Sequence, residues 1–221
     1  MRSLEKMTDK VIDEIVETKE VPDYFERSSL SLFNSESMGL RGKYTTKVSW
    51  CIVNNNWLDE LAKILKGHKC LEIYGGLGLI SYQLQKRDID IMCTDIKSFY
   101  AMDFNKTYTD VQYMSSVDAV ESYEKNTLDY VVASWIPYKD PYCTRVSTIL
   151  AERQPKCKIV YIGEWQGGCT ASDRFFNYTD DISYTKENKR SISSISKNFQ
   201  SWDWIHDDVY LLKPRKEYGK C

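Results

Sequence analysis

The stretch "LEIYGGLGLIS", residues 71–81, decides the fold, because an apolar run leads directly into a glycine-rich turn. We expect a buried strand at 70–74 and a helix at 79–86 on either side of the turn. Glycines lack a Cβ atom, so the turn can approach a ligand closely and adopt positive φ; it contains Gly75, Gly76 and Gly78. Glu72 places a carboxylate where a buried strand favours an aliphatic side chain. Such a carboxylate is tolerated if it meets a bound cation, so the stretch predicts a ligand site.

The alternation of strand, turn and helix continues towards the C-terminus. Further apolar runs predict strands at 89–94, 111–114, 128–136, 158–165 and 208–214. A helix is expected at 143–152, and Thr170 and Asp173 have the spacing of a capping box at another helix start. Strands that alternate with helices imply a mostly parallel sheet with helices on both faces, a doubly wound α/β fold.

The residues before the glycine turn predict helices and an irregular connection. Apolar spacing favours a short amphipathic helix at 4–18 and a helix at 45–66 that is interrupted near 54–56. Residues 20–43 contain a proline, a serine cluster and two glycines, which is typical of an irregular arm. We therefore divide the chain into an N-terminal helix and arm or lid, 1–43, and a ligand-binding domain, 44–221.

Composition narrows the class of protein. The chain has 221 residues and a net charge of −2, so no global charge favours nucleic acid as a partner. No apolar run is long enough for a membrane helix. The 7 cysteines form no CxxC pair, which fits a reducing, cytoplasmic location, and with 2 histidines we expect no metal site. A composition rich in Lys, Asn, Ile and Tyr fits an AT-rich genome, including a viral one.

A second acid supports a bound ribose. Asp95 follows the strand at 89–94, about 20 residues past the glycines, where a carboxylate can accept hydrogen bonds from ribose hydroxyls. Two interpretations of the turn compete here. Residues 76–81 approximate the GxGxxG dinucleotide fingerprint with serine last, but Glu72 interrupts the apolar strand that this fingerprint expects.

The second interpretation explains Glu72. Residues 72–78 resemble motif I of the class I S-adenosylmethionine (SAM)-dependent methyltransferases, E/D-x-G-x-G-x-G. Glu72 takes the acid position, and Gly76 and Gly78 take the second and third glycines, whereas Tyr74 replaces the first glycine and Gly75 is extra. The resemblance implies a Rossmann-like fold with seven strands, the one at 208–214 antiparallel.

The resemblance also implies SAM as the cofactor. Glu72 would then face its aminopropyl-carboxylate end, Asp95 its ribose, and Ile96 its adenine ring. In the segment 115–123, Asp118 corresponds to an acid that binds the adenine amino group, and it is equally well explained as a helix N-cap.

The acceptor side is expected at the ends of the next strands. "ASWIPYKDPY", residues 133–142, resembles the D/N/S-P-P-Y/F/W motif of amino-methylating enzymes with one residue too many. Ser134 and Tyr138 are candidate catalytic residues, and Trp135 and Pro137 candidate substrate contacts. The alternative is a buried strand that runs into a proline-terminated loop.

A second acceptor-side candidate is "GEWQGGCTASDRFF", residues 163–176. Glu164 is a candidate base whose pKa burial would raise, and Trp165 would project into the same crevice as Ser134 and Trp135. A surface loop with two glycines is the alternative. In the tail, Trp202, Trp204 and His206 alternate and would share one strand face, so we assign them to the core.

These features favour a SAM-dependent methyltransferase, with N-methylation slightly preferred. A non-catalytic structural or regulatory protein on the same fold is the alternative, and a nicotinamide-dependent oxidoreductase comes third because Glu72 opposes it. The methyl acceptor, whether nucleobase, metabolite or peptide, and the oligomeric state are not defined by the sequence.

Overall fold

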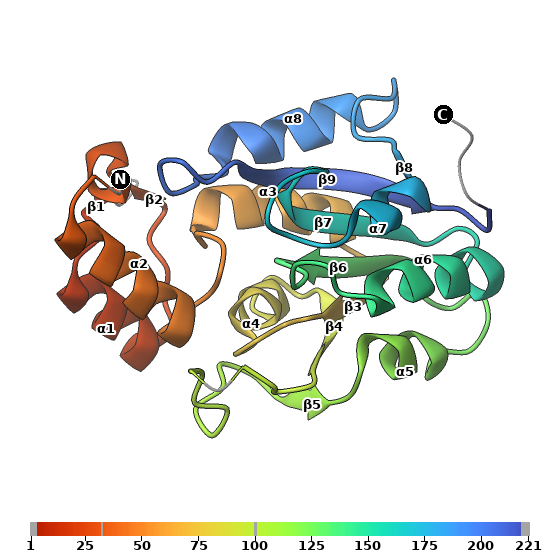
Figure 1. The fold of residues 1–221 in the computed structure, drawn as a ribbon, viewed down its shortest axis with the longest axis horizontal. Helices are drawn as coiled ribbons and strands as arrows, with labels where there is room; N and C mark the ends of the chain where they lie inside the picture. Colours follow the sequence, from red (N-terminus) through yellow and green to blue (C-terminus); the bar gives the residue numbers. More distant parts are fainter. Residues whose placement is uncertain (1–3, 32, 100, 218–221) are drawn as a thin grey trace.

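The computed structural model describes residues 4–31, 33–99 and 101–217. Seven strands form one sheet in the order β5-β4-β3-β6-β7-β9-β8 (Figure 1). Their bounds are β3 Lys69–Ile73, β4 Asp90–Asp95, β5 Val111–Tyr113, β6 Tyr130–Ser134, β7 Lys158–Glu164, β8 Thr179–Asp181 and β9 Asp207–Pro214. β9 pairs antiparallel with β7 and β8, and the other pairs are parallel. The predicted α/β fold with a mostly parallel, doubly wound sheet is confirmed.

The direction of winding reverses between β3 and β6. From β3 the chain proceeds through β4 to β5 on one side, and from β6 it continues to β7 on the other. In sheets of this kind, ligands bind beyond the carboxyl ends of the strands at the point of reversal. The glycine turn follows β3 directly, so the fold places it at this point.

Helices cover both faces of the sheet (Figure 1). The residues of α3 (Asn55–Leu65), α4 (Leu79–Gln85) and α8 (Lys189–Asn198) pack in one hydrophobic cluster. Those of α5 (Ser116–Glu121), α6 (Tyr142–Arg153) and α7 (Asp173–Asn177) pack in the other. Strand residues alternate between the clusters, as the two-residue period of a strand requires: Val160 and Ile162 face the first, and Ile159 and Tyr161 the second.

The N-terminal segment forms a small lobe beside the sheet (Figure 1). It contains β1 (Leu4–Glu5), α1 (Asp9–Thr18), β2 (Tyr24–Phe25), a 3-10 helix (Arg27–Leu30) and α2 (Ser35–Lys47). The predicted helix at 4–18 therefore begins only at residue 9, after the Thr8 cap. The predicted irregular arm is wrong in part, since the Asn34 side chain caps α2 within it. The division at 43/44 lies inside α2 and stays a prediction.

Three local expectations need correction. Residues 48–54 are not helical, because α2 ends at Lys47 and α3 begins only after its Asn54 cap. The helix after β7, α7, is capped by Ser172 rather than Thr170. β9 begins at Asp207, so the tail aromatics precede it and share no strand face: Trp202 is 2% exposed, whereas Trp204 is 68% exposed.

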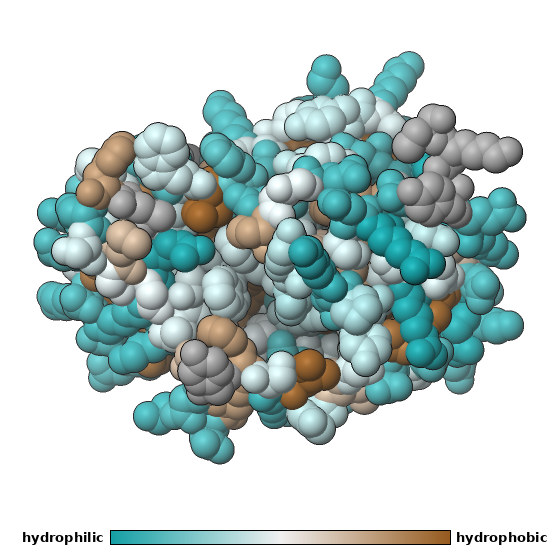
Figure 2. All heavy atoms as spheres, in the orientation of Figure 1, coloured by the Kyte–Doolittle hydropathy of each residue, from teal (hydrophilic) through white to brown (hydrophobic). Residues whose placement is uncertain are grey.

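On the face of the molecule in Figure 2, charged and polar side chains cover the periphery, and apolar ones are scattered in small groups. Within the described residues, every helix is too short or too polar to cross a membrane. Nor do any three His, Cys, Asp or Glu side chains in this part of the chain gather as a metal site requires.

Candidate functional site

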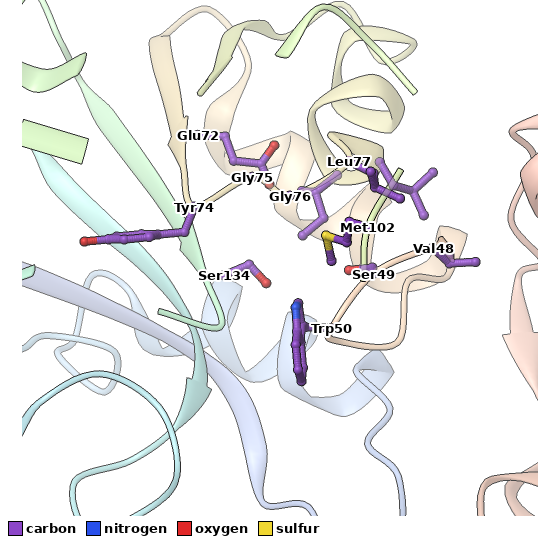
Figure 3. A pocket seen from close by; sticks show the side chains of 12 residues that line it. Val48, Ser49, Trp50, Glu72, Tyr74, Gly75, Gly76, Leu77, Met102 and Ser134 are labelled. Atoms are coloured by element: carbon purple, nitrogen blue, oxygen red, sulfur yellow. The ribbon is translucent and has the colours of Figure 1, made fainter. Parts of the chain in front are cut away.

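Four predicted residues at the carboxyl ends of the strands lie on one face of the sheet: Glu72, Asp95, Ser134 and Glu164. In each strand, the residue two or four positions earlier belongs to the first hydrophobic cluster. Side chains separated by two or four residues lie on the same face of a strand, so all four side chains share the face of that cluster. A cavity at this edge is lined by five predicted residues, Glu72, Tyr74, Gly75, Gly76 and Ser134. The remaining lining residues are Val48, Ser49, Trp50, Leu77, Leu79, Ile80 and Met102 (Figure 3).

Glu72 is almost completely buried, at 1% exposure. Its Oε2 accepts hydrogen bonds from the backbone N–H of Ser81, at 3.1 Å, and from the Ser81 hydroxyl. Burial raises the pKa of Glu72 to about 7 because the charged form is poorly solvated. The carboxyl group is thus poised between its two forms near neutral pH, and a cation in the cavity would favour the charged form.

The glycine turn is held against Asp95. The N–H of Gly76 donates to Asp95 Oδ2 at 2.9 Å, and the N–H of Lys97 donates to Oδ1 at 2.6 Å. Burial raises the pKa of Asp95, while these two backbone donors oppose the rise. A carboxylate accepts about four hydrogen bonds, so each oxygen retains a lone pair for a ligand hydroxyl.

The three glycines serve different purposes. A Cβ on Gly75 would lie 2.4 Å from Cys93 Sγ, and one on Gly78 would lie 2.8 Å from Val111 Cγ2, so both positions are required by internal packing. A Cβ on Gly76 would contact only the flexible end of Met102, at 3.6 Å. Gly76 is therefore the glycine at which the backbone lies open towards the cavity.

Tyr74 adopts a left-handed backbone conformation, with φ 57°, a region that favours glycine. This conformation costs an ordinary residue about 1–2 kcal/mol. Its hydroxyl donates to Asp140 Oδ2 at 2.6 Å and lies 2.9 Å from Ser116 Oγ. The ring therefore points away from Trp50 and Met102 (Figure 3) and does not crowd the space between them.

Ile96 and Asp118 lie outside the described cavity lining. Ile96 follows β4 and is exposed. Ser115 caps α5, and its hydroxyl donates to Asp118 Oδ2 at 2.6 Å while accepting from the Asp118 N–H. Asp118 is thus part of a capping pair but is not the N-cap itself, and adenine contacts for Ile96 and Asp118 stay predictions.

Trp135 reaches the cavity only through Trp50. The two rings stack with centroids 5.5 Å apart and planes at 23°. Trp135 Nε1 donates to Asp207 Oδ2 at 2.9 Å, and burial raises the pKa of Asp207 to about 6. Asp207 Oδ1 is buried and has no hydrogen-bond partner among the described residues. The stacked rings of Trp50 and Trp135 and the buried carboxyl group of Asp207 thus lie close to Ser134.

The expectations for Glu164 and Trp165 are partly wrong. Glu164 Oε2 accepts from the N–H of Cys169 at 2.7 Å, and Oε1 from that of His206 at 3.0 Å. Burial alone would raise the pKa of Glu164, but hydrogen bonds from the Cys169 side chain and from these two backbone N–H groups outweigh it, so the pKa lies below its ordinary value. Trp165 lies on the opposite face from Glu164, with its ring centroid 4.8 Å from that of Phe176 and 4.9 Å from that of Tyr210, because adjacent residues of an extended chain project to opposite sides.

Pro137 and Tyr138 lie in an exposed loop. Tyr138 is 59% exposed, and its ring is near Lys139 Nζ, 5.0 Å from the centroid. Among the described residues, Ser134 lines the cavity but neither Pro137 nor Tyr138 does. The structure therefore does not bring the three parts of the expected amino-methylation motif together.

The sheet order decides the fold. It has seven strands, and the last in the chain is antiparallel, as the resemblance implied. The chain has the fold of the class I methyltransferases. No family model and no curated protein sequence matches it.

Solved structures with a similar fold include a putative methylase from Haemophilus influenzae, which is 12% identical, with a TM-score of 0.44 over 71% of this chain and 92% of that one. A SAM-dependent methyltransferase from Archaeoglobus fulgidus is 13% identical, with a TM-score of 0.44 over 72% and 95%. A mutant of MtNAS in complex with SAM is 11% identical, with a TM-score of 0.46 over 93% and 72%. Likeness at this level does not extend to activity or substrate.

Several site residues carry no sequence signal. Trp50 is better explained from the sequence as an ordinary helix face, yet it lies in the loop between α2 and α3 and lines the cavity. Met102 lies in the long connection after β4, which has no regular pattern. In the sequence, Asp207 is one of several acids in the tail. Each of these residues reaches the site through tertiary packing.

The cavity is nearly filled by its own side chains. It leaves about 20 Å³ for solvent, which is room for a single water molecule. Pockets for ligands of SAM's size are on the order of 300–1,000 Å³. A ligand of such a size would therefore displace lining side chains, and Met102 is the candidate because its end lies over Gly76.

We expect Met102→Ala to raise the affinity for SAM about threefold or more, because the ligand no longer displaces a buried side chain. Stability should fall by about 2 kcal/mol. Calorimetric titration and urea unfolding measure the two effects. Met92→Ala, on the other face of the sheet, should lower stability without changing affinity. An unchanged affinity in Met102→Ala would show that this side chain does not occupy the ligand's place.

Proposed function

We propose that the protein is a SAM-dependent methyltransferase with an unidentified acceptor, N-methylation being slightly favoured. The observation that carries the proposal is the contact of Gly76 N–H with Asp95 beside the buried Glu72. Two acids on the neighbouring strands β3 and β4 thus lie beside a glycine that is open to the cavity, at the point where the strand order reverses. By the resemblance, Glu72 would face the amino acid end of SAM, Asp95 would bind its ribose, and Gly76 would let the backbone approach the ligand closely.

When bound, SAM supplies an electrophilic methyl group. Glu72 would hold its ammonium group, since a buried carboxylate without a cation is poorly solvated. Asp95 would accept hydrogen bonds from the ribose hydroxyls while it keeps the Gly76 turn in place. The protein's remaining task is to align the acceptor.

On the acceptor side, Ser134 is the predicted catalytic residue that lines the cavity, with Trp50 and Trp135 as aromatic neighbours. The lowered pKa of Glu164 makes it a weak base. We keep Tyr138 as a proposed catalytic residue and Pro137 as a proposed substrate contact, but not Trp165, which packs against Phe176 and Tyr210 on the opposite face. We also retain the lid 1–43, the domain 44–221 and a cytoplasmic location as proposals.

The proposal is tested on the ribose side by Asp95→Ala. We expect the affinity for SAM to fall about 30-fold or more, because the variant loses the ribose acceptor and the anchor of Gly76. Calorimetric titration of both proteins with SAM and S-adenosylhomocysteine measures it. Asp90→Ala, at an exposed acid at the opposite end of the same strand β4, serves as the matched control and should bind SAM as wild type does. Equal affinities of wild type and Asp95→Ala would contradict a ribose at Asp95.

One observation favours the non-catalytic alternative. The loop with Pro137 and Tyr138 does not line the cavity, so the expected acceptor motif is not assembled. Transfer of a labelled methyl group from SAM to nucleobases, small metabolites and peptides separates the two functions. Transfer that Ser134→Ala reduces supports the enzyme. Tight SAM binding without transfer to any acceptor class supports the structural or regulatory protein.

A further inference from the structure

A second, larger cavity lies at the other end of the strands, where β7 begins and β9 ends. It has a volume of about 580 Å³ and is lined from the turn before β7, the end of β9 and the segment between β8 and α8. These parts lie together at the end of the sheet away from the N-terminal lobe (Figure 1). We call it the lysine groove; its lining residues are Pro155, Lys156, Lys158, Ile182, Thr185, Lys186, Glu187, Asn188 and Lys213.

The lysine groove is strongly basic, although the protein as a whole carries a small negative charge. Four of its nine lining residues are lysines and one is an acid, Glu187, whereas the whole chain has a net charge of −2. Within the described residues, none of these four lysines is in an ion pair. Four unpaired positive charges around one hollow repel one another, and an anion in the groove would relieve this repulsion.

The groove has a firm frame. Lys158 begins β7 and Lys213 lies near the end of β9, on two strands that pair directly. On the third side, Asn188 Nδ2 donates to the Ile182 carbonyl at 3.0 Å and to Thr185 Oγ1 at 2.9 Å, which braces the segment 182–188. The lysines therefore project from fixed backbone positions, and the groove exists before any ligand binds.

The nature of these charges indicates the ligand. Lysine is a flexible point charge that contacts phosphates without reading their geometry, whereas a site for one planar anion favours arginine. The lysines come from three separate segments, and the hollow is much larger than one phosphate group. Several phosphates in a row satisfy such an arrangement better than a single small anion.

We propose that the lysine groove binds the phosphodiester backbone of a single-stranded nucleic acid, without sequence specificity. The proposal does not depend on methyl transfer. The candidate site lies beyond the carboxyl end of β7, at Glu164, whereas the groove lies at its amino end, at Lys158. The groove would thus be a docking site remote from the cavity.

The test uses the full chain and fluorescently labelled 12-nucleotide RNA and DNA of mixed sequence, with anisotropy measured between 50 and 200 mM salt. Four phosphate contacts on a single strand predict a slope of log affinity against log salt near −2.8, about a 50-fold loss over this range. Lys158→Gln with Lys213→Gln should reduce the slope by about 1.4 and weaken binding about tenfold or more at 50 mM salt. Glu187→Gln should strengthen binding, because it removes the acid from the lining.

The control is Lys6→Gln with Lys10→Gln, two exposed lysines of the N-terminal lobe that change the net charge equally. The control pair should retain nearly wild-type binding, and all variants should keep the wild-type melting temperature and SAM affinity. Equal weakening of oligonucleotide binding by both pairs would show that only net charge matters. It would overturn the proposal that the groove is the binding site. Absence of oligonucleotide binding by folded wild type overturns the proposal. Displacement by millimolar inorganic phosphate, lost in the groove pair, would instead identify a small-anion site and overturn the strand ligand.

Discussion

Replacement of Glu72 by Gln is expected to weaken SAM binding about 30-fold or more. The change preserves shape but removes the negative charge that would meet the ligand's ammonium group, and loss of one partner of a buried charge pair costs about 2–5 kcal/mol. Calorimetric titration at pH 8, where the wild-type carboxyl group is ionised, measures the change. Glu121→Gln, an exposed acid on α5, is the matched control and should bind SAM as wild type does. An affinity unchanged in Glu72→Gln would contradict the assigned role.

The pKa of Glu72 adds a pH dependence of known sign. Because the group titrates at about 7 in the folded protein, it is increasingly protonated below that pH and cannot pair with a cation. Wild-type affinity should therefore fall by up to about tenfold per pH unit below 7, and Glu72→Gln should lose this dependence. Without ligand, the folded state binds more protons than the unfolded chain between pH 4.5, the ordinary pKa of a glutamate, and about pH 7. Stability should then decrease as pH rises through this window.

Replacement of Gly78 by Ala is expected to lower the free energy of unfolding by about 2–5 kcal/mol. The residue has φ +81°, and its added Cβ would lie 2.8 Å from Val111 Cγ2 and 2.9 Å from Thr109 Cγ2. The left-handed backbone contributes about 1–2 kcal/mol of this cost and overpacking about 1–3 kcal/mol. Urea unfolding measures the difference.

Gly67 provides the control for backbone strain alone. It has φ +79°, but an added Cβ would have nothing within 4 Å. Gly67→Ala should therefore cost only about 1–2 kcal/mol. If both variants lose the same stability, the contacts of Gly78 with the segment before β5 do not constrain the turn as described.

The elements around the glycine turn could be predicted because their signals are local. Apolar runs, the glycines and the acids at strand ends predict β3, β4 and the positions of Glu72 and Asp95, since parallel strands end at one edge of a sheet. The placement of Trp165 failed because neighbouring strand residues face opposite sides, and Trp165 follows Glu164 directly.

The rest of the site depends on packing between distant segments. Trp50 reaches the cavity because the chain leaves the helical conformation after Lys47, and Met102 because a loop without regular pattern folds over Gly76. The pKa of Glu164 is lowered, against the effect of burial, by hydrogen bonds from the Cys169 side chain and from the backbone N–H groups of His206 and Cys169, which only the folded loop brings to this carboxylate. Signals of this kind emerge only when the backbone path is known.

Calorimetric titration of folded, ligand-free wild-type protein with SAM, with NAD in parallel, decides whether the glycine turn forms a SAM site. We expect one SAM site with a micromolar Kd and no binding of NAD. Absence of a SAM signal from such a sample would show that the turn binds no SAM. The glycine turn, Glu72 and Asp95 would then serve only to connect and stabilise β3 and β4.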